Sequence, residues 1–192
     1  MSTDAKTEKR ALRADTRQRR RSHGELLLAE HGEQISLRLQ QLVAEHGATR
    51  ISCYLSGEFE PSTRPFLAWA GAADTTVLLP VTREDGLLDW VVSDGQSERP
   101  HELGFPEATG DLLGPIALGD ADLLIIPAAS VDLDGYRMGW GRGYFDRTLG
   151  SMAGRPPVYA VVYDDELLEV VPREAHDERV DGVVTPSGIR RF

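Results

Sequence analysis

The chain has 192 residues, of which 41% are hydrophobic and 27% charged, and its formal net charge is −10. This composition is typical of a globular protein with a substantial core, and we expect one domain over residues 1–192. A membrane span and a secretory signal are excluded, because no run approaches roughly 20 apolar residues and the first twenty residues are highly charged. We therefore expect a cytoplasmic protein that does not bind membranes.

The chain opens with an arm, residues 3–46, that is predicted to be helical. Good helix formers run through it, and apolar residues in its second half recur near helical spacing. We expect Gly24 and Gly32 to divide the arm into shorter helices, because glycine disfavours a helix interior. The apolar positions are Leu28, Ile35, Leu39, Leu42 and Val43.

Positive charge is concentrated at the start of this arm. Residues 1–21 hold eight lysines and arginines against three acidic residues, whereas the remainder holds thirteen against twenty-eight. On a helix, Lys9, Arg13 and Arg20 fall within one narrow arc, so three cations can face one site. An acidic body repels a long polyanion such as nucleic acid, and a nucleotide triphosphate fits better. The alternative is a solvated basic helix, which is what most charge runs are.

Six short apolar or β-branched runs follow the arm, with helical or loop segments between several of them. Runs such as "DLLIIPA" are continuously apolar, which is typical of strands buried on both faces of a sheet. The pattern predicts an α/β protein with a mostly parallel, helix-covered sheet. Residues 82–120 are polar and rich in turns, and we expect an excursion there that carries a small β-hairpin. The runs are "RISCYL", "TTVLLPV", "LLDWVV", "DLLIIPA", "PVYAVVY" and "DGVVTP".

A glycine-rich loop follows the run "DLLIIPA", and ligands of open α/β sheets gather beyond the carboxyl ends of strands. Gly139, Gly141 and Gly143 alternate with larger residues, which lets the backbone approach an anion closely. Arg137 and Arg142 add positive charge. The spacing is neither that of a dinucleotide fingerprint nor that of a Walker loop, so a phosphate-binding loop and a structural strand-to-helix turn both remain open.

The segment "DGYRMGWGRGYFDR" resembles the signature of the 5-formyltetrahydrofolate cyclo-ligase family. Further elements match the family in the same order: "KRALR" at 9–13, "EPST" at 60–63, "LGFPEATG" at 103–110 and "VPREAHDERVDGVVTP" at 171–186. The likeness covers nearly the whole chain, and its departures, such as Met138 and Phe145, mostly conserve size. The matching signature positions are Asp132, Gly135, Arg137, Gly139, Gly141, Gly143, Tyr144, Asp146 and Arg147.

This resemblance implies an α/β/α sandwich related to sugar-phosphate isomerases (the NagB and RpiA type) and CoA transferases. It also implies an activity, the closure of 5-formyltetrahydrofolate to 5,10-methenyltetrahydrofolate with release of ADP and phosphate. ATP would be the co-substrate and Mg²⁺ the cofactor. The expected partners are the folate and ATP, and we expect a monomer. In this chemistry the formyl oxygen is phosphorylated and N10 then closes the ring.

The resemblance also assigns roles to positions. It places Lys9, Arg10 and Arg13 at ATP, and Asp146 and Asp177 at Mg²⁺, which suits a cation that prefers carboxylates and phosphate oxygens. The catalytic candidates are Arg137, Arg142, Tyr144 and Glu60. The ATP-binding loop comprises Arg137, Gly139, Gly141, Arg142, Gly143 and Tyr144, and the folate-side residues are Leu55, Glu60, Trp140 and Tyr144.

Plainer interpretations stay open. Asp177 is equally consistent with a loop acid, Glu60 with an exposed acid and Trp140 with a buried anchor, and spacing gives Glu107 and Asp132 no role. A sugar-phosphate isomerase or acyl transferase of the same fold is the main enzymatic alternative. The other alternative is a noncatalytic relative that binds nucleotides or RNA.

Overall fold

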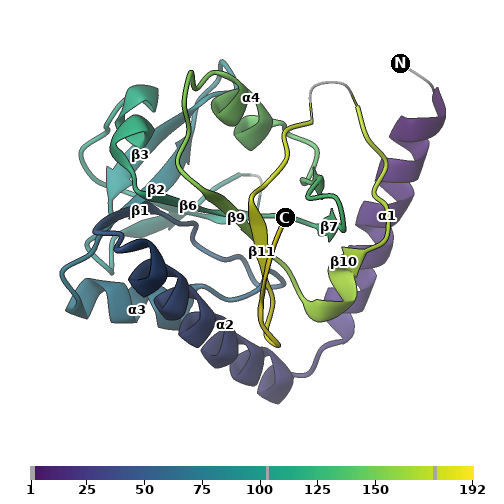
Figure 1. The fold of residues 1–192 in the computed structure, drawn as a ribbon, viewed down its shortest axis with the longest axis horizontal. Helices are drawn as coiled ribbons and strands as arrows, with labels where there is room; N and C mark the ends of the chain where they lie inside the picture. The colour runs from purple at the N-terminus through teal and green to yellow at the C-terminus, as the bar shows by residue number, and fades with distance from the viewer. Residues whose placement is uncertain (1–2, 103, 175–176) are drawn as a thin grey trace.

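A largely parallel sheet forms the centre of the computed structural model, which describes residues 3–102, 104–174 and 177–192 (Figure 1). Within these residues seven strands run in the order β12-β11-β9-β6-β1-β2-β3, and the five inner strands are parallel. The six predicted runs all form strands of this sheet. Their bounds, with the last strand added, are β1 (Arg50–Ser52), β2 (Thr76–Thr82), β3 (Leu88–Val92), β6 (Leu123–Pro127), β9 (Val158–Val161), β11 (Gly182–Val184) and β12 (Ile189–Arg191).

The central strand β6 is buried on both faces, as its continuous apolar run predicts. Leu123 and Ile125 pack in one core cluster with residues of α2 (Glu25–His46) and α3 (Arg64–Ala72). Leu124 and Ile126 pack in the other, with residues of η1 (Pro115–Asp120) and α4 (Tyr144–Gly150). Figure 1 shows α2 and α3 below the sheet and α4 above it. The strand's alternation of side chains thus produces the two helical layers.

The N-terminal arm forms two helices, α1 (Thr3–Ser22) and α2, with the break at Gly24 as predicted. The expected second break at Gly32 was wrong, because this glycine lies buried inside α2. A Cβ there would stand only 3.2 Å from Ser62 Cβ, so Gly32 serves close packing against the loop before α3. The sequence does not distinguish a packing glycine from a helix breaker.

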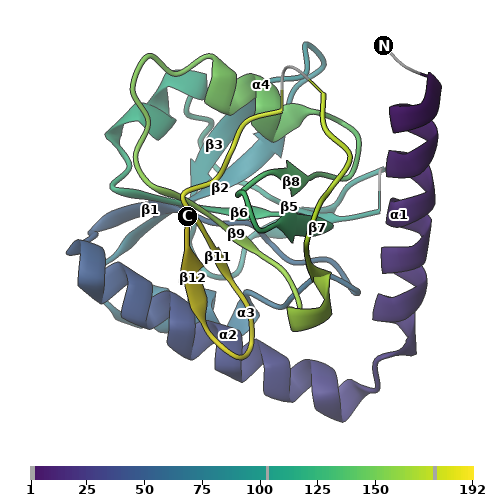
Figure 2. The same cartoon turned by 45° about the vertical axis from the view of Figure 1, so that its right-hand side comes forward.

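The helix α1 turns away from α2 and runs beside a second, small sheet rather than along the central one (Figure 2). This sheet joins β7 (Ser130–Asp132), β8 (Arg137–Met138) and β10 (Leu167–Leu168). The short helix η2 (Asp164–Glu166) directly precedes β10. Within the described chain, no helix is both long enough and apolar enough to cross a membrane.

The expected hairpin excursion consists of β4 (Glu98–Pro100) and β5 (Pro106–Ala108), which pair antiparallel. Glu107 of this hairpin is buried and accepts bonds from the Thr82 N–H (2.8 Å) and the Arg99 guanidinium (2.8 Å). These bonds outweigh burial, which alone would raise the pKa of Glu107, and hold it below its ordinary value. Glu107 therefore fixes the hairpin to the end of β2.

Asp132, the other acid without a predicted role, is fully buried at the end of β7, where the turn to β8 begins. Its Oδ1 accepts the N–H groups of Asp134 (3.0 Å) and Tyr136 (2.9 Å), and its Oδ2 lies 3.2 Å from Arg173. A short acid that accepts nearby backbone N–H groups fixes a turn. Its place in the motif is thus accounted for by the conformation of the loop.

Candidate active site

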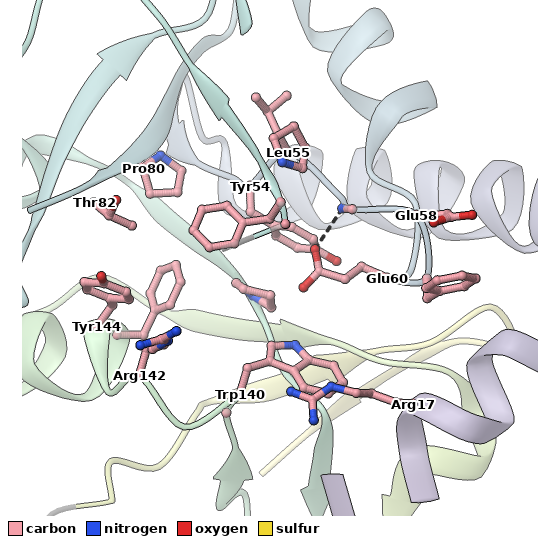
Figure 3. Close-up of a pocket in the computed structure, with 18 of the residues that line it drawn as sticks. Arg17, Tyr54, Leu55, Glu58, Glu60, Pro80, Thr82, Trp140, Arg142 and Tyr144 are labelled. Carbon is pink, nitrogen blue, oxygen red and sulfur yellow. Dashed lines mark hydrogen bonds between the residues drawn. The ribbon is translucent and has the colours of Figure 1, made fainter. Parts of the chain in front are cut away.

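A pocket of about 530 Å³ opens at the carboxyl ends of the central strands (Figure 3). Tyr54 and Leu55 line it just after β1, Thr82 lines it at the end of β2, and Pro127 at the end of β6. This is the edge at which parallel α/β sheets bind ligands, because the strand-to-helix connections diverge there. The site therefore lies where the sequence places the glycine-rich loop.

The glycine-rich loop forms the opposite wall of the pocket, and Figure 3 shows Trp140, Arg142 and Tyr144 across from Tyr54 and Leu55. Gly141 (φ +93°) and Gly143 (φ +70°) adopt the left-handed region, which disfavours any residue with a Cβ. A Cβ on Gly143 would also stand 2.9 Å from the Arg147 guanidinium. The loop conformation thus requires glycine at these two positions.

The helix α1 packs on the outside of this loop. The Arg13 Nε donates to the carbonyl oxygen of Gly139 (2.8 Å), and a Cβ on Gly141 would lie 3.2 Å from the Arg13 Cζ. The guanidinium of Arg17 stands 5.0 Å from the centre of the Trp140 ring. The predicted cationic face of the first helix is therefore turned toward the glycine-rich loop.

A buried ion pair joins the start of the loop to α4. The Arg137 guanidinium donates to Asp146 Oδ1 at 2.6 Å, and its side chain is 2% exposed. Burial lowers the pKa of Arg137, and Asp146, Asp177 and Glu178 oppose that decrease. The paired Arg137 and Asp146 both line the pocket, which gives one wall a fixed cation and a fixed carboxylate.

The second predicted metal ligand, Asp177, is not among the residues that line the pocket, and it lies close to cations of α1. Asp177 Oδ2 accepts from Lys9 Nζ at 2.7 Å, and Lys9 also bonds Glu174 at 2.9 Å. Burial lowers the pKa of Arg13, and Arg17 lowers it further, while Asp177, Glu174 and Asp146 oppose the decrease. Both predicted metal carboxylates thus act on one guanidinium. The described residues contain no group of three or more His, Cys, Asp or Glu side chains arranged for a metal ion.

Glu60 follows β1 in the opposite wall and faces Trp140 across the pocket (Figure 3). Its Oε2 accepts the N–H of Gly57 at 2.9 Å. Burial raises the pKa of Glu60, while the Gly57 N–H, the charge of Arg20 and the Trp140 indole oppose the increase. The carboxyl group is therefore held in a partly dry environment, in contrast to an exposed loop acid.

Comparison with known proteins adds a decisive observation, because the model of the 5-formyltetrahydrofolate cyclo-ligase family matches residues 5–186. The chain belongs to this family. Cyclo-ligases so named from Mycolicibacterium smegmatis and Escherichia coli are 34% and 32% identical to it. The first alignment covers 93% of both chains, and the second covers 90% of this chain and 97% of the relative.

A solved structure of the family supports the same fold. The Aquifex aeolicus 5,10-methenyltetrahydrofolate synthetase aligns with a TM-score of 0.78 at 25% identity, over 95% of this chain and 92% of the other. The likeness thus extends over nearly the whole length of both chains.

The predicted cyclo-ligase residues divide into two groups in space. One group lines the pocket: Leu55, Glu60, Arg137, Gly139, Trp140, Arg142, Gly143, Tyr144 and Asp146. The remainder lie behind the loop. Lys9 is buried in its ion pairs, Arg13 contacts Gly139, Gly141 packs against Arg13, and Arg10 is exposed on α1.

Some residues that line the pocket were given no role by the sequence. Arg17 and Arg21 extend into it from α1, and their spacing of four residues within the basic run was the available signal. Arg20 lines it too, in agreement with its place in the predicted cationic arc. Phe105 comes from the hairpin, inside a motif that had been matched without a role, and Phe145 lies in the matched loop signature. Thr82 carries no motif signal, because only the fold brings it to the pocket.

The single cysteine takes no part in this site. Cys53 is buried in the core, and burial raises its pKa to about 12. A thiol with such a pKa stays protonated at neutral pH and is a poor nucleophile.

Proposed function

We propose that this protein cyclises 5-formyltetrahydrofolate to 5,10-methenyltetrahydrofolate, with ATP converted to ADP and phosphate. The observation that carries this proposal is the pairing of two unlike walls in one pocket. One wall is a glycine-rich loop with Arg137 and Arg142, and the other carries the half-buried carboxyl of Glu60 beside apolar and aromatic side chains. Membership of the cyclo-ligase family supports the same assignment.

The loop wall suits the triphosphate. Arg137 is fixed by its bond to Asp146, whereas Arg142 is exposed at the pocket and free to adjust to an arriving anion. Because phosphoryl transfer needs alignment and charge neutralisation more than covalent chemistry, two guanidiniums at one loop are appropriate catalysts. Lys9, Arg10 and Arg13 would extend this positive field along α1.

The folate fits between the two walls. Leu55 in the opposite wall, with Trp140 and Tyr144 in the loop wall, offers apolar and flat surfaces for the pterin or the aminobenzoyl ring. Glu60 presents a carboxylate, which accepts hydrogen bonds and has no hydrogen to donate when it is ionised. It therefore fits pterin N–H groups and stabilises positive charge that develops on the ring.

Asp146 and Asp177 fit Mg²⁺ as a donor set, because both are hard carboxylates that act on the same Arg13 guanidinium. A cation with two protein carboxylates takes its other ligands from phosphates and water. Mg²⁺ held there would neutralise charge on the triphosphate. The bonds from Arg137 and Lys9 hold each carboxylate in place before any ligand arrives.

The proposed sequence of steps uses these groups in order. The formyl oxygen attacks the γ-phosphorus of ATP while Arg137 and Arg142 stabilise the transferred phosphoryl group, and ADP leaves. N10 then adds to the activated formyl carbon, with Glu60 stabilising the positive charge. Breakage of the C–O bond then releases phosphate, which takes up the N10 proton, and leaves the methenyl bridge. Trp140 and Tyr144 hold the rings so that the reacting atoms meet.

Mixing the protein with MgATP and 5-formyltetrahydrofolate tests the proposal. We expect the near-ultraviolet absorbance of the methenyl product to rise in step with ADP release, and neither to occur when one substrate is omitted. A protein that binds MgATP without releasing ADP would be a noncatalytic relative. Turnover of a sugar phosphate or an acyl thioester alone would identify the enzymatic alternative.

The proposal extends to the fold class, the domain organisation, the location in the cell and the oligomeric state of the protein. The parallel sheet and its two helical layers are consistent with kinship to sugar-phosphate isomerases and CoA transferases. The packing of the arm on the loop is consistent with one domain over residues 1–192. We further propose that the protein is cytoplasmic and monomeric. Measurement of its mass in solution tests whether it is a monomer.

A further inference from the structure

Arg20 lies at the junction of α1, the glycine-rich loop and the small sheet. Its side chain is 1% exposed and makes two bonds to Glu166, from Nε to Oε1 (2.6 Å) and from Nη2 to Oε2 (2.8 Å). The Nη2 also donates to the carbonyl oxygen of Ala128, just beyond β6 (2.9 Å). A forked, bidentate contact of this kind fixes the plane of the guanidinium.

Two aromatic rings lie against this fixed plane. The Arg20 Cζ is 5.0 Å from the centre of the Trp140 ring and 5.5 Å from that of Tyr163. Trp140 belongs to the glycine-rich loop and faces Glu60 across the pocket (Figure 3). Arg20 also lines the pocket. Arg20 therefore places a fixed positive charge against Trp140 of the loop wall, in the same pocket that Glu60 lines from the opposite wall.

The neighbouring arginines of α1 lack the buried ion pair. Arg17 also stands 5.0 Å from the Trp140 ring, but Arg17 and Arg21 are exposed, and Arg19 pairs with Asp15 and Asp165 at the surface. The side chains of Arg20 and Glu166 are each 1% exposed, and burying either charge alone would cost much free energy. The pair therefore fixes the geometry of the two side chains more than it adds to the stability of the fold. Such a pair beside a binding pocket calls for a functional explanation.

We propose that Arg20 is a positioning residue, which orients Trp140 in the loop wall and holds a fixed positive charge at the pocket that Glu60 lines from the opposite wall. The inference rests on the proposed function, because it gives Glu60 and Trp140 their significance. Arg20 acts through these two side chains and needs no contact with the reacting atoms.

The charged groups around Glu60 support this role. Arg20 is the cation that lowers the pKa of Glu60, against the burial that raises it. Arg17, Arg21 and Glu58 line the same pocket, and two tyrosines also act on Glu60: burial raises the pKa of Tyr163 to about 12, and it raises that of Tyr54 also. Both tyrosines are neutral at ordinary pH, so Arg20 supplies the compensating charge.

The decisive variant replaces both members of the pair, Arg20→Met with Glu166→Gln, so that no buried charge loses its partner. The glutamine oxygen can still accept the Tyr163 N–H that Glu166 accepts at 2.8 Å. We expect kcat to fall between about tenfold and a hundredfold, because a small displacement at the site has effects of that size. The acidic limb of the pH–rate profile should move to higher pH, because Glu60 loses its cation.

Two further variants separate charge from shape. Arg20→Lys keeps the charge and loses the planar fork, so its acidic limb should stay near that of the parent while kcat falls. Arg19→Met removes a cation from the same turn of α1 outside the pocket, and it should leave both the profile and kcat unchanged. Melting temperatures of all variants identify any loss of kcat that follows from unfolding.

A measurement without substrate keeps the inference independent of the proposed activity. The carboxyl resonance of Glu60 is titrated by ¹³C NMR in the parent and in the double variant, with Glu60→Gln for assignment. We expect a higher pKa in the double variant. An unmoved pKa overturns the inference whether or not the parent turns over, and an unchanged kcat in a folded double variant also overturns it. A parent with a Glu60 shift but no methenyl product would refute the proposed function alone.

Discussion

Glu60 illustrates how a short loop gives an ordinary side chain a particular chemistry. The bond from the Gly57 N–H holds the carboxyl group, and its surroundings are dry enough to raise its pKa. The raised pKa of Glu60 determines how activity should depend on pH. If the carboxylate is the working form, turnover is lost as pH falls through a pKa that lies above the usual range for glutamate.

We expect Glu60→Gln to lose most turnover and to bind MgATP nearly as the parent does. A neutral amide has one acceptor oxygen and adds donors where none are wanted, so a loss of roughly 2–4 kcal/mol in transition-state stabilisation is expected. Calorimetry with each ligand and turnover under saturating ATP measure this, with Glu84→Gln on an exposed turn as the control. A variant that binds folate and turns over like the parent would remove Glu60 from the site.

We expect Asp146→Asn and Asp177→Asn each to need far more Mg²⁺ for activity, because each removes one charge from the proposed cation site. Asp146→Asn should also unfold more easily, by about 1–3 kcal/mol, since the buried Arg137 loses its ionised partner. Activity against Mg²⁺ concentration and urea denaturation measure the two effects. Asp134→Asn, an exposed acid near the loop, is the control, and an unchanged Mg²⁺ requirement in both variants would contradict the metal assignment.

The positions of single residues were predicted best where the local sequence decides them. The sequence placed the alternating glycines and Arg137 in a loop beyond the strand β6, and Gly139, Gly143 and Arg137 line the pocket there. Arg20 was placed correctly in the cationic arc, but its partner Glu166 lies 146 positions away. No spacing along the chain indicates such a pair, because only the packing of α1 on the small sheet creates it.

At the scale of elements, α1 is the segment whose role depends most on the proposed ligand. We expect Lys9→Ala or Arg13→Ala to weaken ATP binding by about ten- to a hundredfold, because one bond to a charged group is worth about 1.5–3 kcal/mol. Folate binding should change less. Removal of residues 1–14 should have a larger effect of the same kind.

Calorimetry with ATP and folate separately measures this selectivity. Lys6→Ala provides the control, because Lys6 is an exposed cation on the same helix. Unchanged ATP affinity after removal of residues 1–14 would favour the alternative interpretation of a solvated basic helix.

The longer elements were predictable from their apolar patterns, and the shortest were not. Every strand of the central sheet except β12 corresponds to an apolar or β-branched run, because burial on both faces requires one. The small sheet has strands of two or three residues, which is too few for a period of two to show. It forms because the glycine-rich loop folds back on itself, with Val131 opposite Arg137.

At the scale of the whole molecule, acidic groups at strand ends connect fold stability to pH. Asp122 accepts the N–H groups of Arg50 (2.9 Å) and Thr49 (2.8 Å), and these bonds lower its pKa. A depressed pKa contributes stability above the unfolded-state value, and that contribution is lost as pH falls through the folded-state value.

Asp122→Asn should therefore lower the free energy of unfolding at pH 7 and have a progressively smaller effect below about pH 4, where the unfolded-state carboxyl also becomes protonated. Urea denaturation at a series of pH values follows the difference between the two proteins. Asp120→Asn, an exposed neighbour in η1, controls for the general loss of charge. A constant difference across the series would show that the Asp122 bonds do not depend on its ionisation.

The two long helices differ in what they bury, and this has a consequence for how the molecule comes apart. Among the described residues of α1 the buried side chains are Lys9, Thr16 and Arg20, whereas α2 buries four aliphatic side chains. Polar contacts fix orientation but add little free energy against solvent. We therefore expect the helix α1 to open as a separate cooperative unit of low stability. Its amides should exchange hydrogen for deuterium through openings that leave the central sheet intact.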